Sequence, residues 1–337
     1  MIKLPHDLYD HFINDYIALL LRKGFDKESF FELISKAGDH NEAYRIPDEQ
    51  KEDFLRTVLV NPFSKETLKK YSLLNDYFQC IKNGDKNNPN QVINIIDSFM
   101  IPRGNKSLTL KDIFDYSGFI SKTEKKKTLR VYIIEAAGVE VCPYCNRQYI
   151  DIFDKNNGES KAIAQLDHYY PKEKYPLYAL SLYNLIPVCG SCNQGKAEEV
   201  GKVIYPFSRK ANEENRAPYF KIKADDLDKL TGKVLPQIDY AFEQDDSGNR
   251  KKQHADFFYH KNMYQNHQRF AQRLLQAQKL DNQAYLDGMN KVLEKENLRL
   301  SKSELRELLY GFNGSDEELL QKPLSKLARD LIPSLKK

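Results

Sequence analysis

Two short stretches, Cys142-Pro143-Tyr144-Cys145 and Cys189-Gly190-Ser191-Cys192, are the most informative part of this sequence. Each stretch holds two thiols one tight turn apart, and residues 146–188 separate the two stretches. Structural zinc sites commonly combine two such turns, because four thiolates complete a tetrahedron around the ion. A closed tetrahedron has no open position, so we expect this zinc to stabilise the fold and to take no part in chemistry. Redox chemistry at one pair is the alternative, and two matched pairs disfavour it.

Length and composition set the class of protein. The chain has 337 residues, of which 41% are hydrophobic and 30% charged, a balance typical of folded globular proteins. A single core stops growing at about 250–300 residues, which favours more than one domain. No apolar run is long enough to cross a membrane, and the first residues lack a secretory signal, so we expect a cytoplasmic protein without a membrane partner. The net charge of +4 alone does not indicate nucleic acid.

The organisation predicted along the chain is mainly α, with a small α+β module inserted between two helical regions. The hydrophobic spacing of Phe12, Tyr16 and Leu20 indicates a helix near the start. Capping boxes are predicted at Ser29–Glu32 and Ser301–Glu304. The three predicted parts are an N-terminal helical region (1–130), the module with both cysteine pairs (131–207) and a C-terminal helical region (208–337).

Inside the module, the segment between the cysteine pairs has the pattern of a hairpin. Gln148–Phe153 is strand-like, Asn157-Gly158 is a tight-turn signal, and Ala162–Leu166 is the expected return strand. A helix is expected to start near Asn193. The sequence therefore predicts a strand–strand–helix unit around the second cysteine pair.

Polar residues with catalytic potential surround that unit. Asp167-His168 follows the return strand, Asn184 precedes the second cysteine pair, and Asn193 follows it. A lone Asp-His pair is more often a satisfied polar pair, but this spacing favours a shared site. An imidazole with a pKa near about 6.5 is suited to activate water at cellular pH. Carboxylate and amide oxygens suit Mg²⁺ or Mn²⁺, so the residues match phosphodiester hydrolysis.

Taken together, the Asp-His, Asn and Cys-x-x-Cys-Asn-x-x-Lys pattern over residues 140–200 resembles the HNH endonuclease family. The resemblance implies a ββα-metal fold, held here by a four-cysteine zinc site, and metal-dependent cleavage of nucleic acid, DNA rather than RNA. It implies that His168 is the general base and that Asp167 and Asn193 bind the catalytic Mg²⁺ or Mn²⁺. Asn184 matches the asparagine that braces the loop around the histidine. The family often has a histidine where this chain has Asn193, which leaves the metal preference open.

Three basic residues are candidates for contacts with substrate phosphates, namely Lys196, Arg147 and Lys172. Lys196 is equally well explained as a solvated lysine. The basic run Ser121–Arg130 is interpreted first as a solvated surface and second as a phosphate-contacting patch.

The flanking helical regions are loosely similar to those of HNH nuclease subunits in bacterial antiphage systems, which are paired with an SMC-like ATPase. That similarity implies an ATPase partner and a role in antiviral defence. A rival interpretation is a non-catalytic zinc ribbon that binds nucleic acid or protein, which would have no use for Asp167, His168 and Asn193 together. A second rival is a four-cysteine redox or zinc sensor.

Overall fold

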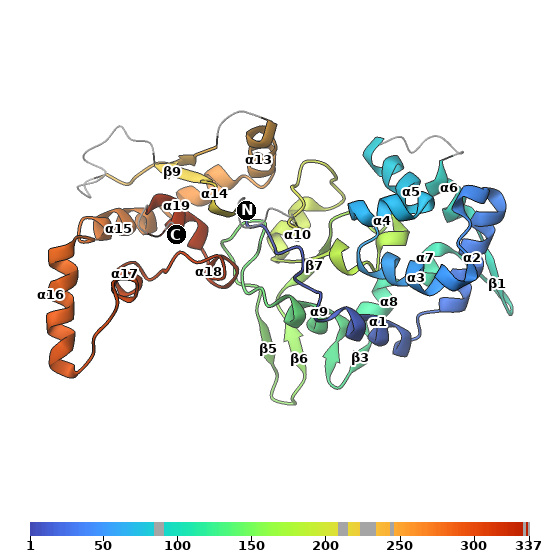
Figure 1. Cartoon of the computed structure of the whole chain (residues 1–337), viewed down its shortest axis with the longest axis horizontal. Helices are drawn as coiled ribbons and strands as arrows, with labels where there is room; N and C mark the ends of the chain where they lie inside the picture. The colour runs from blue at the N-terminus through green and yellow to red at the C-terminus, as the bar shows by residue number, and fades with distance from the viewer. Residues whose placement is uncertain (84–90, 208–214, 223–233, 243–245, 333–334, 336–337) are drawn as a thin grey trace. The chain divides into compact units, whose positions relative to one another are not determined.

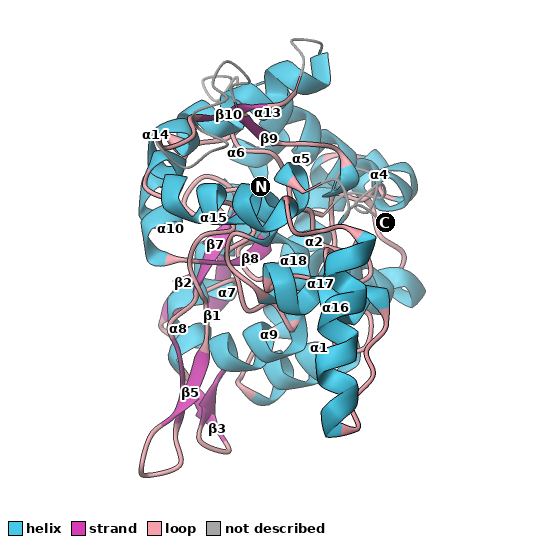
Figure 2. Ribbon diagram, turned by 90° about the vertical axis from the view of Figure 1, so that its left-hand side faces the viewer, coloured by secondary structure: helices cyan, strands magenta, loops and turns pink. Residues whose placement is uncertain are grey.

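A computed structural model describes residues 1–83, 91–207, 215–222, 234–242, 246–332 and 335 (Figure 1). About half of the chain is helical, and the strands are short and pair two by two (Figure 2). Such isolated pairs cannot form an extended sheet, so helices supply most of the core. The predicted combination of a largely helical chain with small strand pairs is confirmed at this level.

Two compact units divide the chain, and each is assembled from separate segments. The first, called the cysteine unit, comprises residues 1–6, 138–151 and 188–337. The second, called the Asp-His unit, comprises residues 7–137 and 152–187. The borders at 137/138, 151/152 and 187/188 all fall inside the segment 131–207, which the sequence suggested as one module. The three-part division therefore stays a prediction, and each unit is described by itself.

The helices of the Asp-His unit precede residue 138, and short 3₁₀ turns lie among them and in the segment 176–184. Their burial follows the predicted spacing in the first helix, where Tyr16 and Leu20 are buried. The helices are α1 (Ile13–Arg22), α2 (Lys27–His40), α3 (Lys51–Val60), α4 (Lys65–Lys70), α5 (Ser72–Asn83), α6 (Val92–Ser98), α7 (Leu110–Ile113), α8 (Tyr116–Ser121) and α9 (Leu129–Ala137). The 3₁₀ turns are η1 (Glu42–Tyr44), η2 (Asp48–Gln50), η3 (Pro176–Tyr178) and η4 (Leu182–Asn184).

Helix α2 begins earlier than its predicted capping box. The N-cap is Asp26, whose carboxylate accepts a hydrogen bond from the Ser29 backbone N–H at 2.9 Å. Ser29 therefore lies inside the first turn, and the capping box predicted at Ser29–Glu32 is wrong. Aspartate is among the preferred N-cap residues, because its oxygen satisfies a backbone N–H that the helix leaves unpaired.

Aromatic rings fill the core between α2, α3 and α7. Phe30 of α2 stacks on Phe54 of α3 with 6.1 Å between ring centroids. Phe114, which follows α7, meets Phe30 edge-on at 5.6 Å and Phe25 at 5.4 Å. Edge-to-face and offset contacts of this kind stabilise a core beyond the area they bury.

The strands of the Asp-His unit form hairpins and one further pair. The hairpin predicted around Asn157-Gly158 exists, but its first strand starts at Ile152 and not at Gln148. The cause is that the Gln148 carbonyl accepts from the Cys142 N–H at 3.0 Å and so belongs to the first cysteine turn. The return strand of this hairpin is Ser160–Ala162 and not Ala162–Leu166, because Gln165–His168 forms a separate strand that pairs with Leu185–Val188. The strands are β1 (Ile101–Arg103) with β2 (Lys106–Leu108), β3 (Thr123–Glu124) with β4 (Lys127–Thr128), β5 (Ile152–Asp154) with β6 (Ser160–Ala162), and β7 (Gln165–His168) with β8 (Leu185–Val188).

The cysteine unit combines the segment 138–151 with the C-terminal helices. Its core packs Phe220, Tyr264 and Leu327 together, and Phe220 lies 4.1 Å from the Tyr264 ring centroid. The capping box predicted at Ser301–Glu304 is confirmed. The elements are α10 (Gly190–Lys196), β9 (Phe220–Ile222), β10 (Ile238–Tyr240), α13 (Asp246–Phe257), α14 (His260–Gln265), α15 (Gln268–Gln278), α16 (Gln283–Leu293), η5 (Glu294–Glu296), α17 (Lys302–Tyr310), α18 (Glu318–Gln321) and α19 (Ser325–Leu331).

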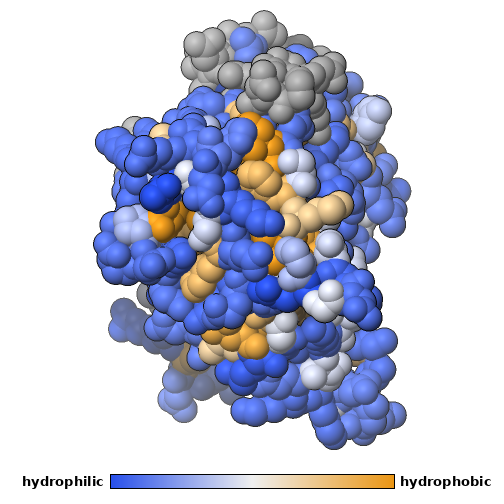
Figure 3. All heavy atoms as spheres, turned by 90° about the vertical axis from the view of Figure 1, so that its right-hand side faces the viewer, coloured by the Kyte–Doolittle hydropathy of each residue, from blue (hydrophilic) through white to orange (hydrophobic). Residues whose placement is uncertain are grey.

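The surface agrees with the composition of the chain. The face in Figure 3 is mostly hydrophilic, with apolar residues exposed in smaller areas between the charged ones. Within the described ranges, none of the helices combines the length and apolar character needed to cross a bilayer.

Candidate metal centre and Asp-His site

The four cysteines predicted to act together lie together in the cysteine unit. Their sulfur atoms are all within 4.8 Å of one another. All four side chains are buried, with exposed fractions of 0% for Cys142, 1% for Cys145, 4% for Cys189 and 3% for Cys192. A tetrahedron with zinc–sulfur bonds of about 2.3 Å has edges of about 3.8 Å, which this spacing can meet. The cluster could therefore hold a metal ion such as zinc.

Burial and the hydrogen bonds among the four thiols shift their pKa values in opposite directions. Burial raises the pKa of the Cys142 thiol well above its ordinary value. The hydrogen bond from Cys142 lowers the pKa of the Cys145 thiol. Four buried thiolates would repel one another in the absence of a positive charge, and Zn²⁺ supplies that charge while replacing the protons.

The first cysteine turn depends on the buried residue that follows it, Asn146. Its backbone is left-handed, with φ of 49°, and its N–H donates to the Cys142 carbonyl at 2.7 Å. Its side-chain amide donates to the Leu319 carbonyl at 3.1 Å and accepts from the Lys326 N–H at 2.9 Å. Asparagine tolerates this conformation better than most residues, and both ends of its amide are used. Asn146 thus joins the turn to α18 and α19.

Two further side chains from the C-terminal helices bind the same turn. The Tyr264 hydroxyl of α14 donates to the Cys145 carbonyl at 2.7 Å. His254 of α13 accepts from the Ile204 N–H at Nδ1, at 3.2 Å, and its Nε2 lies 3.3 Å from the Tyr144 carbonyl. Because that carbonyl can only accept, the His254 proton resides on Nε2. Burial lowers the pKa of His254 to about 3, so the ring is neutral at physiological pH.

In the Asp-His unit, Asp167 and His168 occupy the end of β7. Asp167 is 2% exposed and His168 is half-buried. His168 Nε2 lies 3.0 Å from the Ala179 carbonyl. A carbonyl accepts and cannot donate, so the neutral ring carries its proton on Nε2 and its lone pair on Nδ1. The imidazole is thereby oriented with a defined basic nitrogen.

Asn184 holds the chain that follows His168. Its carbonyl oxygen Oδ1 accepts from the Tyr170 N–H at 2.8 Å. Its Nδ2 donates to the carbonyls of Tyr170 at 3.0 Å and Tyr178 at 2.9 Å. The Asn184 backbone carbonyl accepts from the Tyr169 N–H at 3.0 Å. This fully buried residue therefore fixes both ends of the loop between β7 and β8.

Tyr116 at the start of α8 contacts the imidazole directly. Its ring meets the His168 ring edge-on, with 4.3 Å between centroids. Burial raises the pKa of Tyr116 most, and among nearby charges Arg130 lowers it while Asp167 raises it. Sequence inspection missed Tyr116, because its place in a predicted helical region gives no sign of a contact with residue 168.

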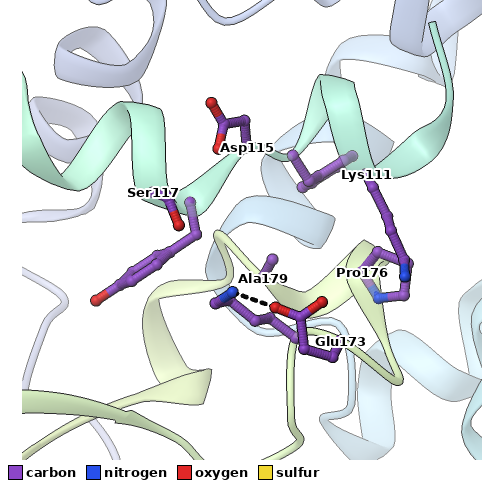
Figure 4. Close-up of a pocket in the computed structure, with 9 residues that line it drawn as sticks. Lys111, Asp115, Ser117, Glu173, Pro176 and Ala179 are labelled. Atoms are coloured by element: carbon purple, nitrogen blue, oxygen red, sulfur yellow. Dashed lines mark hydrogen bonds and ion pairs between the residues drawn. The ribbon is translucent and has the colours of Figure 1, made fainter.

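A cavity of about 210 Å³ adjoins this contact (Figure 4). Lys111, Asp115 and Ser117 approach it from the α7–α8 segment, and Glu173, Pro176 and Ala179 approach it from the loop after β7. The ion pair with Lys172, at 2.5 Å, lowers the pKa of Glu173, and the charges of Lys111 and His168 act in the same direction. The cavity beside His168 is thus polar and holds charges of both signs.

The other predicted site residues are placed as follows. Asn193 and Lys196 lie on α10 of the cysteine unit, where Asn193 is half-buried and Lys196 is 1% exposed. The alternative of a solvated lysine at position 196 is therefore wrong. Arg147, in the same unit, lies with its guanidinium 6.0 Å from the Tyr264 ring centroid and donates from Nε to His267 Nε2 at 3.0 Å. Lys172 is paired with Glu173 in the Asp-His unit. Their roles in binding substrate remain predictions.

Comparison with known proteins gives one partial match. The chain is 32% identical over 93 residues to protein ea31 of Escherichia phage lambda. The match covers 25% of this chain and 27% of ea31, so the chain spans about a quarter of the length of that relative. No family model matches the chain. No solved structure matches it either.

Proposed function

We propose that this protein is a metal-dependent endonuclease of the HNH type that hydrolyses phosphodiester bonds of nucleic acid, with DNA as the favoured substrate. One observation carries the proposal: a buried carboxylate and an imidazole with a defined basic nitrogen end β7, and Asn184 fixes the loop that leads to β8. In chain order, β8 runs directly into Cys189 and α10. The resemblance implies a strand–strand–helix order, and β7, β8 and α10 follow one another in that order, although the hairpin predicted for the two strands is the separate pair β5–β6.

In this proposal His168 is the general base. Its Nε2–H is held by the Ala179 carbonyl, so Nδ1 accepts a proton from the attacking water. Tyr116 and Asn184 position the imidazole through the ring contact and the loop. Only a neutral imidazole has a lone pair at Nδ1, so base catalysis uses the neutral form of the ring.

The donor set for the second metal is chemically suitable. Asp167 offers carboxylate oxygens, which Mg²⁺ and Mn²⁺ prefer over thiolates. The resemblance assigns Asn193, on α10 of the cysteine unit, as a second oxygen ligand. A carboxylate as buried as Asp167 is stable in its charged form when positive charge or hydrogen bonds compensate it. When bound, the cation supplies charge stabilisation for the leaving oxygen. The four cysteines would hold zinc as a separate, structural ion.

Cleavage of supercoiled plasmid tests the proposal. The purified protein is expected to nick or linearise plasmid with Mg²⁺ or Mn²⁺ and to stop when the free divalent cation is chelated. The His168→Ala variant should lose about 10²–10⁴ in rate, since general-base catalysis contributes about that much. The exposed His40→Ala variant is the matched control and should cleave like the parent. Zinc content and melting temperature should be the same in all three proteins.

Other outcomes would favour the rival interpretation of a non-catalytic zinc module or remove His168 from the mechanism. Plasmid that binds and is never cleaved, with zinc retained, would indicate a non-catalytic zinc module. Cleavage by His168→Ala at the parent rate would remove His168 from the mechanism. The ATPase partner and the role in antiviral defence remain predictions. Cleavage measured with and without a candidate ATPase tests the first of them.

A further inference from the structure

A second cavity in the Asp-His unit, of about 490 Å³, lies where the β3–β4 and β5–β6 hairpins meet. The hairpins lie side by side (Figures 1 and 2), and the Ser160 N–H of β6 donates to the Lys126 carbonyl at 3.2 Å. Most of the lining is polar. The lining residues are Ile120, Ser121, Thr123, Lys126, Thr128, Arg130, Lys155, Glu159, Ser160, Lys161 and Ala162.

Positive charge exceeds negative charge in this lining. Lys155 and Glu159 form an ion pair at 2.9 Å and largely cancel each other. Lys126, Arg130 and Lys161 remain as cations. The half-buried guanidinium of Arg130 has no hydrogen bond or ion pair to any residue in the described ranges. A guanidinium in this state is ready to bind an anion, because its five donors match phosphate geometry.

The turn of the β3–β4 hairpin supports a role for the lysines as charges. Glu124 pairs with Lys127, so Lys125 and Lys126 alone form the two-residue loop. Both have left-handed backbones, with φ of 47° and 65°. Such loops favour Asn-Gly, because side chains with a Cβ are strained there. Two lysines in this turn oppose the local conformational preference, and Lys126 is the one of the two that lines the cavity.

The cavity and the Asp-His pair belong to the same unit and share neighbouring elements. Ser160, Lys161 and Ala162 of β6 line it, and β7, which ends at His168, begins three residues later. On the other wall, Arg130 is close enough to Tyr116 to lower its pKa, and Tyr116 contacts His168. Arg130 and His168 thus share Tyr116 as a neighbour, which places the cavity lining near the proposed catalytic base.

We infer that this cavity binds the phosphodiester backbone of the nucleic-acid substrate beside the cleavage site, with Lys126, Arg130 and Lys161 as the phosphate contacts. The inference rests on the proposed function and adds the surface that holds the substrate. Lysine, arginine and hydroxyl side chains are the usual partners of phosphate oxygens, and they carry no base specificity. None of the described lining residues is aromatic, so the chemistry favours backbone contact over base stacking.

The test is equilibrium binding without cleavage. The full-length protein is titrated with a fluorescent 30-base-pair duplex at several NaCl concentrations, in buffer without added divalent cation. The triple variant Lys126→Gln, Arg130→Gln, Lys161→Gln should bind about tenfold or more weakly at 0.1 M salt. The logarithm of the binding constant falls linearly with the logarithm of the salt concentration. For the triple variant the magnitude of this slope should be smaller by about 0.9 for each lost phosphate contact.

The matched control changes three lysines that lie outside both cavities. Lys65→Gln, Lys69→Gln, Lys106→Gln removes the same charge from exposed positions of the Asp-His unit and should keep the parent affinity and slope. Equal melting temperatures exclude misfolding in either variant. Inorganic phosphate is the second probe, and millimolar phosphate should compete with the duplex in the parent only modestly, because it offers one group and not a chain of them.

Each outcome is decisive. Duplex binding by the triple variant with parent affinity and slope overturns the inference, as does equal weakening by the control, or failure of the parent to bind duplex. Tight binding of inorganic phosphate without duplex binding assigns the cavity to a free anion and also overturns it. Because binding is measured without cleavage, a parent that binds through this cavity but never cuts supports the inference and contradicts the proposed function.

Discussion

At the scale of single residues, the amide of Asn184 has the most demanding role in the Asp-His unit. The Asn184 side chain is 0% exposed. Its amide N–H groups donate to two backbone carbonyls, and its amide oxygen accepts from a backbone N–H. Asn184→Asp keeps the shape but places an oxygen against the carbonyls of Tyr170 and Tyr178. Burying an unsatisfied polar group costs about 1–3 kcal/mol, more if it is charged. Urea denaturation should show this loss, and activity per folded molecule should fall as the loop after His168 loosens.

The control for this change is Asn105→Asp, which alters an exposed amide of the same unit outside the proposed site. A fully stable Asn184→Asp protein would show that the three hydrogen bonds do not fix the loop.

A second residue-scale prediction concerns the loss of folding stability at low pH through His254. The pKa of His254 is about 3 in the folded protein, chiefly through burial and next through the charge of the amino terminus. In the unfolded chain it is about 6.5. A depressed pKa means that the unfolded state takes up the proton first, so this stability is present above pH 6.5 and is lost as the pH falls toward 3. Between pH 7 and 5 the loss is about 2 kcal/mol.

His254→Gln should remove that loss, since glutamine offers an oxygen to the Ile204 N–H and an N–H to the Tyr144 carbonyl. The free energy of unfolding, measured at both pH values with zinc present, should change less in the variant by about 2 kcal/mol. An identical pH dependence in both proteins would contradict the assignment.

Single residues also show which parts of the candidate sites could be predicted from the sequence. The cysteine cluster was predictable because each pair is local and its spacing has a chemical meaning. Asn146, Tyr116 and Tyr264 were not, since their roles depend on partners more than fifty positions away. No periodicity in the sequence encodes such a contact.

At the scale of elements, the turn of the β3–β4 hairpin yields a prediction about both stability and binding. Replacing Lys125-Lys126 by Asn-Gly suits the left-handed backbone at both positions. Relief of strain should stabilise the protein by about 1 kcal/mol, because a left-handed conformation costs about 1–2 kcal/mol at an ordinary residue. The loss of the exposed hydrogen bond from Lys126 Nζ to the Asn157 carbonyl offsets part of the gain. Thermal melting measures the increase, and duplex binding should weaken in the same variant.

Exchange of Gly158 in the neighbouring hairpin gives the opposite control. Its φ is 78°, so Gly158→Ala should lower the melting temperature. An Asn-Gly variant that is less stable than the parent would mean that the turn is not strained.

Elements also show why boundaries were harder to predict than the elements themselves. The first helix was expected from Phe12, Tyr16 and Leu20, and α1 confirms it with Tyr16 and Leu20 buried. The hairpin around Asn157-Gly158 was also expected, but its first strand was placed four residues early and its return strand two residues late. Gln148 has strand-like neighbours, and only its long-range bond to Cys142 reveals that it belongs to the cysteine turn.

At the scale of the whole molecule, the first cysteine turn is held by residues far along the chain. Tyr264, Leu319 and Lys326 all bind Cys145 or Asn146. We therefore expect the fragment 131–207, expressed alone with zinc, to lack a stable fold. Circular dichroism and amide dispersion in a two-dimensional NMR spectrum would measure this. A well-folded, zinc-loaded fragment would instead support an independent module at 131–207.

Sequence alone gave no signal for this arrangement. Composition changes little at residues 6/7, 137/138 or 187/188, where the chain passes between units. Helix propensity and hydrophobic spacing describe segments, whereas the assignment of a segment to a unit depends on packing between distant segments.

The alternation of segments between the two units has a consequence for synthesis on the ribosome. The Lys3 N–H has its partner, the Asn215 side chain, 212 positions later. At about 5–20 residues per second, the first residues wait about 10–40 s for that partner to emerge. The Asp-His unit is complete once residue 187 has left the exit tunnel, while the cysteine unit must wait for α19. Until α19 has emerged, Cys142 and Cys145 are available to cellular thiols, oxidants and chaperones. The yield of correctly metallated protein should therefore respond to translation speed and zinc supply.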